Sequence, residues 1–244
     1  MFGLKFHLSF KSKKLIIFVL FLLFSYTVNS ETVYELDFSN ASGDVITWFD
    51  KKNWKSREDI ADMNLRFENG KLIIEPTSDK LGILMREFNE KEYLFGATKL
   101  RIEWGVDQYP HGADWSGPKE KNRNTREAIS LMVFFGEKKL DSGFFLAPDL
   151  PYFISFFLGE NERSDKVYYG NYWQKGGRYL CIPCDGSLGK TFVTEVNLAK
   201  KFFEIFKKKK MPVTALGIEI DVQNTKKISG RHSKAFIKRI KFFY

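Results

Sequence analysis

The 244-residue sequence predicts an all-β protein, an antiparallel β-sandwich of jelly-roll type with one short amphipathic helix at about residues 197–210. One reason is that short runs of alternating apolar and polar residues recur along the chain, as in strands with one buried face. A second is that turn-prone pieces, such as residues 68–70 and 184–187, separate these runs. A third is that few segments have the helical period, which argues against strands interleaved with long helices.

The first 30 residues have the three parts of a signal peptide. Four lysines between positions 5 and 14 precede an apolar run at residues 15–28, and Val28-Asn29-Ser30 offers a cleavage site. The run is shorter than the roughly 20 residues of a membrane-spanning helix. We therefore expect an exported protein, periplasmic or extracellular, with one β-sandwich domain at residues 31–244. The alternative is an uncleaved segment that stays as a membrane anchor, which is the one membrane contact we expect.

The positive charge of the chain comes partly from this leader. The whole chain has a formal net charge of +9, and removal of the four leader lysines lowers it to about +5. A modest excess of this kind in an exported protein does not indicate a nucleic-acid partner, and we expect none.

Two segments predict strands with one apolar face most clearly. In residues 99–106 the even-numbered positions are apolar, whereas Lys99, Arg101 and Glu103 face the other way. In residues 213–222 the apolar residues again share one face and leave Glu219 and Asp221 outward.

The C-terminal segment predicts a third such strand, with Phe236, Ile240, Phe242 and Tyr244 on one face. Further strands are predicted at residues 33–38, 71–75, 82–88, 128–135, 152–158, 166–172, 178–182 and 191–196.

The predicted helix has a cap, an apolar stripe and a stop. Asn197 can cap its N-terminus, and Leu198, Phe202 and Phe206 recur at helical spacing. Lysines 207–210 match the negative end of the helix dipole, and Pro212 prevents continuation.

The only two cysteines, Cys181 and Cys184, lie in the sequence CIPC. In an oxidising compartment they could close a local disulfide, and two free thiols are the alternative. Redox or zinc chemistry is disfavoured, because no helix pattern follows the motif and only His111 and His232 remain outside the leader as further ligands.

The recognisable catalytic motifs, such as a P-loop, GxSxG or HExxH, do not occur in the sequence. If the protein is an enzyme, His111, Asp114 and Asp221 are the candidate catalytic residues. His111 and Asp114 lie together in a loop after a strand, and Asp221 lies on a strand face beside Glu219.

The residues we predict to bind a ligand are polar side chains on a sheet face and aromatic side chains at its rim. If the strand of Arg101 and Glu103 adjoins that of Glu219 and Asp221, the shared face holds carboxylates with an arginine, a set that can accept hydrogen bonds from sugar hydroxyls. Exposed aromatic rings stack on the apolar faces of sugars. The predicted ligand-binding residues are therefore Arg101, Glu103, Tyr109, Trp115, Tyr172, Trp173, Glu219 and Asp221. No cofactor is expected, although calcium remains an alternative because jelly rolls often bind it.

Residues 102–106 (IEWGV), the loop YPHGAD at residues 109–114 and the strand AISLMVFF at residues 128–135 resemble the bacterial family DUF3047. The segment ALGIEID at residues 215–221, followed by Asn224-Thr225, resembles the closing part of that family. The resemblance covers about residues 65–244. It implies an exported protein, and it implies no particular activity. Thr125-Arg126-Glu127 replaces an acidic pair of the family, so no role for such a pair is implied.

A looser similarity connects YELDF at residues 34–38 and FENGKLIIEP at residues 67–76 with jelly-roll carbohydrate-binding modules. It implies a fold more than a function. The leading hypothesis is a non-catalytic binding module for a polysaccharide or cell-envelope glycan. The alternatives are a polysaccharide lyase or hydrolase, and a structural envelope protein without a small ligand.

Overall fold

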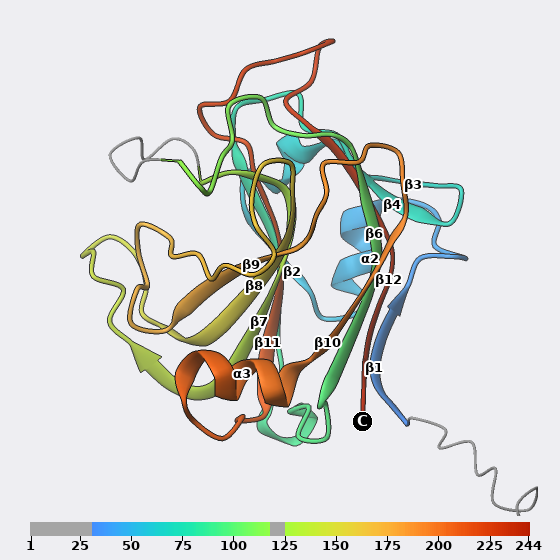
Figure 1. Cartoon of the computed structure of the whole chain (residues 1–244). Coiled ribbons are helices and arrows are strands. Elements are labelled where there is room, and N and C mark those ends of the chain that lie inside the picture. Colours follow the sequence, from blue (N-terminus) through green and yellow to red (C-terminus); the bar gives the residue numbers. More distant parts are fainter. Residues whose placement is uncertain (1–30, 118–124) are drawn as a thin grey trace, which may run out of the picture. The chain divides into compact units, whose positions relative to one another are not determined.

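Two six-stranded β-sheets form a sandwich in the computed structural model (Figure 1), which describes residues 31–117 and 125–244. Thr32–Tyr244 form one compact unit. The predicted signal peptide lies outside the described residues. No helix within the described part of the chain is long and apolar enough to cross a membrane.

The first sheet has the strand order β10-β6-β12-β4-β3, and β1 also pairs with β12. Its strands are β1 (Thr32–Asp37), β3 (Arg66–Glu68), β4 (Lys71–Ile74), β6 (Lys99–Gln108), β10 (Phe192–Asn197) and β12 (Lys234–Phe243). The second sheet has the order β2-β5-β11-β7-β8-β9. Its strands are β2 (Lys55–Glu58), β5 (Leu81–Glu87), β7 (Glu127–Leu140), β8 (Leu150–Gly159), β9 (Gly177–Cys184) and β11 (Val213–Asp221).

The predicted all-β sandwich is confirmed, and the chain passes repeatedly from one sheet to the other, as in jelly rolls. One strand pair departs from the antiparallel prediction, because β8 and β9 are parallel. The long connection between these two strands makes a parallel pairing feasible. It also contains residues 166–172, which are a loop with one isolated bridge between Tyr168 and Tyr179 and not the predicted strand.

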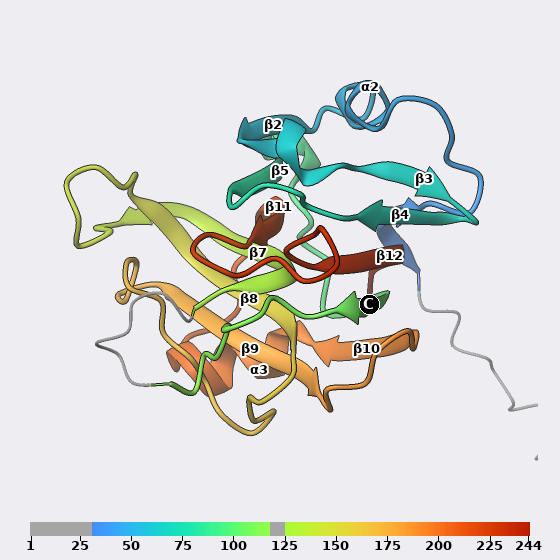
Figure 2. The ribbon, with the colours of Figure 1, turned by 90° about the horizontal axis from the view of Figure 1, so that it is seen from above.

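Two short α-helices lie at opposite edges of the sandwich (Figure 2). α2 (Val45–Asp50) contacts β2, and α3 (Leu198–Phe206) contacts β10. Two 3-10 turns complete the helical elements of the described residues, at Ile60–Met63 and Glu90–Glu92.

The predicted helix begins where its cap places it and ends earlier than expected. The Asn197 side chain accepts a hydrogen bond from the Lys200 amide at 2.9 Å. Lys207 adopts a left-handed conformation with φ of 55°, which ends the helix before the remaining lysines of the run. The prediction of a helix to about residue 210 was therefore too long. α2 was not predicted, although Asp44 caps it in the same way.

The main core lies between the two sheets and uses the faces that the alternation predicted. Leu100, Ile102 and Trp104 of β6 are fully buried there, as are Ile218 and Ile220 of β11. β12 differs, because a bulge between Ile237 and Arg239 shifts its register. Ala235, Ile237, Ile240 and Phe242 therefore face this core, and Phe236 is buried on the opposite side, against Gly105. The prediction that Phe236 shares a face with Ile240 and Phe242 was therefore wrong.

A second apolar cluster covers the outer face of the second sheet. It consists of side chains from β7, β8 and β9 together with two loop residues: Trp115, Met132, Phe134, Phe153, Phe157, Tyr168, Tyr179 and Cys181. The second sheet is consequently buried on both faces across these three strands, which explains why residues 127–136 of β7 are all buried and mostly apolar.

Gly105→Ala tests the packing of β12 on β6. A Cβ atom at this position would lie 2.3 Å from the Lys190 carbonyl oxygen and 2.4 Å from the Phe236 ring. We expect the free energy of unfolding to fall by about 1–3 kcal/mol, as is usual for overpacking. Urea denaturation measures it. Gly217→Ala is the matched control, because its Cβ would meet Met132 at an ordinary 3.4 Å. Equal stability of the two variants would contradict this packing.

Candidate functional site

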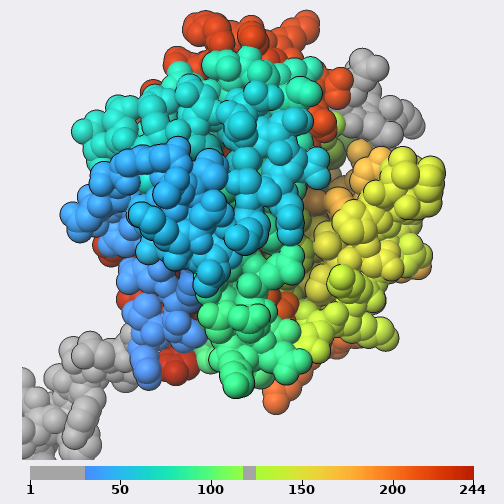
Figure 3. All heavy atoms as spheres, turned by 180° about the vertical axis from the view of Figure 1, so that it is seen from behind, coloured from blue at the N-terminus to red at the C-terminus, as the bar shows by residue number. Residues whose placement is uncertain are grey.

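A cavity of about 290 Å³ opens on the outer side of the second sheet, where the second apolar cluster ends. Figure 3 shows this side of the molecule, where the surface is hollowed between the cyan-to-green segment that contains β5 and the yellow turn from β7 to β8, although that turn does not line the cavity itself. We call it the carboxylate cavity. Its lining consists of Leu81, Trp115, Thr125, Arg126, Glu127, Gly170, Asn171, Tyr172, Trp173, Tyr179, Glu219, Asp221 and Gln223.

Two adjacent strands supply the acidic side chains of the cavity. Glu219 and Asp221 lie on β11, on the face opposite the main core, and β11 pairs Asp221 with Glu127 at the start of β7. The Ser130 hydroxyl donates a hydrogen bond to Glu219 Oε2 at 3.2 Å. Arg126 pairs with Asp221, with Nη1 and Oδ2 3.0 Å apart. Three carboxyl groups and one guanidinium thus converge on one end of the sheet.

Burial and mutual repulsion shift the protonation of these carboxyl groups. Burial raises the pKa of Glu219 to about 7, and the neighbouring charge of Asp221 adds to the rise. Burial also raises the pKa of Asp221 to about 6, although the Arg126 charge opposes it. The pKa of the buried Glu127 is raised well above its ordinary range by burial and then by the charges of Glu219 and Asp221. The cluster therefore retains protons near neutral pH and can both donate and accept hydrogen bonds.

Aromatic side chains form a wall of the cavity beside the carboxyl groups. Trp115 is buried, and its ring lies 4.4 Å from the Tyr179 ring, centroid to centroid. Its Nε1 donates a hydrogen bond to Glu127 Oε2 at 3.1 Å, which joins the wall to the acidic cluster. Tyr172 is 40% exposed. Trp173 is half-buried, and its Nε1 donates to the Pro148 carbonyl at 2.8 Å.

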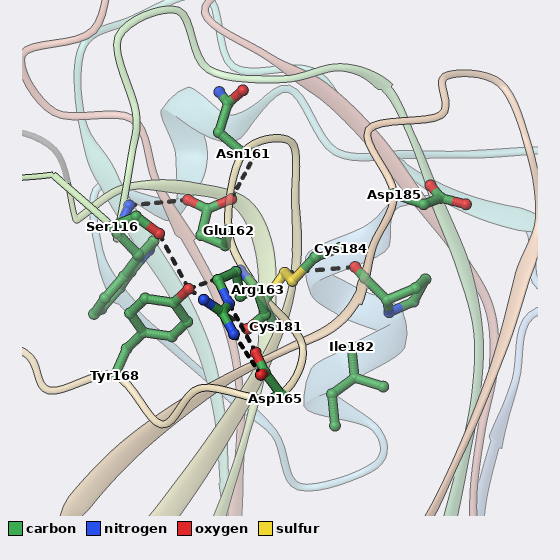
Figure 4. Close-up of a disulfide and its surroundings, with 12 residues drawn as sticks. Ser116, Asn161, Glu162, Arg163, Asp165, Tyr168, Cys181, Ile182, Cys184 and Asp185 are labelled. Atoms are coloured by element: carbon green, nitrogen blue, oxygen red, sulfur yellow. Dashed lines mark hydrogen bonds and ion pairs between the residues drawn. A yellow bond between two sulfur atoms is a disulfide. The ribbon is translucent and has the colours of Figure 1, made fainter.

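The loop that carries Trp115 is held by a buried glutamate. Glu162 Oε1 accepts a hydrogen bond from the Trp115 amide at 2.9 Å, and Oε2 accepts one from the Asn161 amide at 3.1 Å (Figure 4). A disulfide joins Cys181 and Cys184 beside this loop. These contacts fix the Trp115 ring over β8 and β9.

The structure brings together five of the eight predicted ligand-binding residues. Trp115, Tyr172, Trp173, Glu219 and Asp221 all line the carboxylate cavity.

The other three predicted residues lie elsewhere. Arg101 and Glu103 belong to the first sheet, where β6 lies between β10 and β12, so the expectation that their strand adjoins β11 was wrong. There Arg101 forms ion pairs with Glu103 at 3.3 Å and with Glu195 at 2.9 Å. Tyr109 is buried in the main core and not at a rim, because the apolar ring packs between the sheets.

The three candidate catalytic residues do not lie together in the structure. Asp221 lines the carboxylate cavity, but His111 and Asp114 do not. His111 is exposed, and Asp114 Oδ1 accepts a hydrogen bond from the Ser116 amide at 2.8 Å. No group of three or more His, Cys, Asp or Glu residues is arranged to hold a metal ion within residues 31–117 and 125–244.

Sequence reasoning missed Arg126, Glu127 and Tyr179 as lining residues. Glu127 carried a usable signal, because seven of the eight residues that follow it are apolar and Ser130 is the exception. A carboxyl group at the end of a doubly buried strand needs polar partners nearby. Tyr179 carried no such signal, since its place depends on which loops cover β9.

No protein-family model matches the chain, and no curated protein matches it either. Solved structures that are similar include CBM29-2 variants complexed with mannohexaose (13% identity, 88% of this chain and 93% of that chain, TM-score 0.35) and with cellulohexaose (11%, 88% and 90%, TM-score 0.32). These are family 29 carbohydrate-binding modules. The Emp46p carbohydrate recognition domain is similar with 11% identity, 88% and 97% coverage and a TM-score of 0.40. Such values are too low to transfer a ligand or a site residue to this chain.

Glu219→Gln tests the burial of the carboxyl cluster. A carboxyl group whose pKa rises from 4.5 to about 7 on folding stabilises the protein at pH values below 4.5 and loses that contribution as the pH rises through 7. The glutamine amide of the variant does not ionise, so the variant does not lose stability as the pH rises. We therefore expect the variant to gain about 1–3 kcal/mol in the free energy of unfolding at pH 8 and much less at pH 5.

Denaturation at the two pH values measures this difference. Glu87→Gln is the control, because the Glu87 side chain is 74% exposed and should change stability little at either pH. An equal effect of Glu219→Gln at pH 5 and pH 8 would contradict the burial of an ionisable group.

Proposed function

We propose that the protein is an exported module that binds a polysaccharide or a cell-envelope glycan in the carboxylate cavity. The observation that carries the proposal is the pairing of hydrogen-bonding groups with aromatic rings around one cavity. The carboxyl groups of the cavity come from two strands of the second sheet, and its rings come from loops and, for Tyr179, from β9. Sugars present apolar C–H faces and a fringe of hydroxyl groups, so they match both kinds of surface.

The protonation state of the cluster supports a hydroxyl-rich ligand. A neutral carboxyl group donates one hydrogen bond and a carboxylate accepts several, so a partly protonated cluster can engage hydroxyl groups in both senses. Arg126 is the single cation among the described lining residues, and it already pairs with Asp221 and donates to the Gln223 carbonyl. The charge therefore favours a neutral glycan over one rich in carboxylate or sulfate groups.

A binding screen with matched tyrosine variants tests the proposal. The purified protein is applied to insoluble cellulose, mannan, xylan, chitin and peptidoglycan, and titrated with the soluble β-1,4-linked hexasaccharides of glucose, mannose, xylose and N-acetylglucosamine. We expect retention by at least one polymer and a roughly 10-fold or greater loss of affinity in Tyr172→Ala, if a ring stacked on a sugar contributes about as much as one stacked on a nucleic-acid base, about 1–3 kcal/mol.

Tyr169→Ala is the control for this screen. Tyr169 lies in the same segment and is 48% exposed, but it packs under Arg178 and does not line the cavity. Equal loss of affinity in both variants, or no binding by the wild-type protein to any of the glycans, would contradict the proposal.

A second candidate function is glycan cleavage, which the raised pKa values of Glu219 and Asp221 favour. A general acid at neutral pH needs a carboxyl group that keeps its proton, and such groups characterise glycoside-cleaving sites. Reducing-end and unsaturated-product assays on the screened samples test it. Product that depends on Glu219 would establish an enzyme, whereas retention without product would leave a binding module.

A further inference from the structure

An exposed group of aromatic side chains lies next to the carboxylate cavity, at the turn between β7 and β8. Phe145 is 88% exposed and Phe144 is 36% exposed. The Phe144 ring stacks on Tyr172 with centroids 4.9 Å apart and 18° between the planes. The Phe145 ring meets Phe144 edge-on at 5.2 Å. We call Phe144, Phe145 and Tyr172 the aromatic platform.

Polar contacts hold the platform in place. Within the turn, the Ser142 hydroxyl shares its one proton between the Phe144 and Ala147 carbonyls at 2.8 and 2.9 Å, and the Ser142 amide donates to Asp149 Oδ1 at 3.0 Å. The turn is also fastened to the segment that carries Tyr172, because the Trp173 amide donates to the Ser142 carbonyl at 2.8 Å. The exposed rings are thus presented by a turn with a fixed conformation.

The platform is continuous with the carboxylate cavity through one residue. Tyr172 lines the cavity and also stacks on Phe144. The turn also lines a separate open hollow of about 410 Å³, where Asp141, Ser142 and Asp149 add polar groups beside the two phenylalanines. Aromatic and polar groups therefore continue from the carboxylate cavity, through Tyr172, to this hollow.

We propose that the aromatic platform binds further sugar units of the glycan chain whose first units occupy the carboxylate cavity. This inference rests on the proposed function and extends it to a chain of several units. The charge at the turn favours a glycan over an anionic membrane, because Asp141 and Lys175 pair with each other at 2.5 Å and Asp149 adds a negative charge. Exposed rings held by a hydrogen-bonded turn suit the stacking of successive sugar rings.

The test compares ligand length. The purified protein is titrated by calorimetry with the disaccharides and hexasaccharides of the four β-1,4-linked sugars of the screen. For the wild-type protein we expect tighter binding of the hexasaccharide. Phe145→Ala should weaken hexasaccharide binding about 3- to 10-fold and leave disaccharide binding unchanged, because only the longer ligand reaches the platform.

Phe95→Ala is the matched control, since Phe95 is 67% exposed and lines neither cavity. Unchanged hexasaccharide affinity in Phe145→Ala would overturn the inference and leave the proposed function standing. An equal loss for both ligand lengths would also overturn it. No binding of any ligand to the wild-type protein would overturn both proposals.

A vesicle assay tests the rival hypothesis, that the aromatic platform binds a lipid membrane and not a glycan. The wild-type protein and Phe145→Ala are sedimented with vesicles of phosphatidylcholine and phosphatidylglycerol. We expect neither protein to co-sediment. Co-sedimentation of the wild-type protein that is lost in Phe145→Ala would overturn the inference in favour of a lipid surface.

Discussion

The second sheet is buried on both faces across β7, β8 and β9, and this double burial decides where the protein can receive a ligand. One face packs against the first sheet, and the other lies under Trp115, Tyr168 and the loop between β8 and β9. The second apolar cluster on this outer face consists mainly of aromatic rings, and it ends where β7 adjoins β11. At that boundary the side chains on the outer face change from apolar to acidic, and the carboxylate cavity opens. The site is therefore the edge of a second core, and its aromatic wall belongs to that core.

This position accounts for the electrostatics of the site. Carboxyl groups next to a packed aromatic cluster are poorly hydrated, so their charged forms are disfavoured and their pKa values rise. Contacts with Ser130 and Arg126, together with the Trp115 indole, stabilise the cluster against that cost. An acidic group retained at such a cost on a strand face indicates a function more strongly than a solvated surface carboxylate does. The second apolar cluster also holds the segment of Tyr172, which connects the cavity to the aromatic platform.

The sequence was sufficient to predict the sandwich, because each strand with one buried face leaves a period-two pattern, as at residues 99–106. It predicted Glu219 and Asp221 for the same reason, since they are the outward residues of such a pattern, whereas Trp115, Tyr172 and Trp173 were predicted as rings at the rim of a sheet. The sequence-based prediction failed where the position of a residue depends on tertiary contacts. Alternation shows that two residues share a face but not which strand lies beside them, so Arg101 and Glu103 were assigned to the wrong neighbour. Nor does it reveal a bulge, which moved Phe236 out of the main core.

The indole N–H signals of the five tryptophans provide the most direct test of the site. Trp115 and Trp173 line the carboxylate cavity, whereas Trp48, Trp54 and Trp104 lie in or against the main core and serve as internal references. A nitrogen–proton correlation spectrum is recorded while the four hexasaccharides are added in turn. If the cavity binds a glycan, the signals of Trp115 and Trp173 shift in a saturable manner with at least one of them, and the other three stay in place. Shifts confined to the three reference tryptophans, or no shift with any hexasaccharide, would contradict the account.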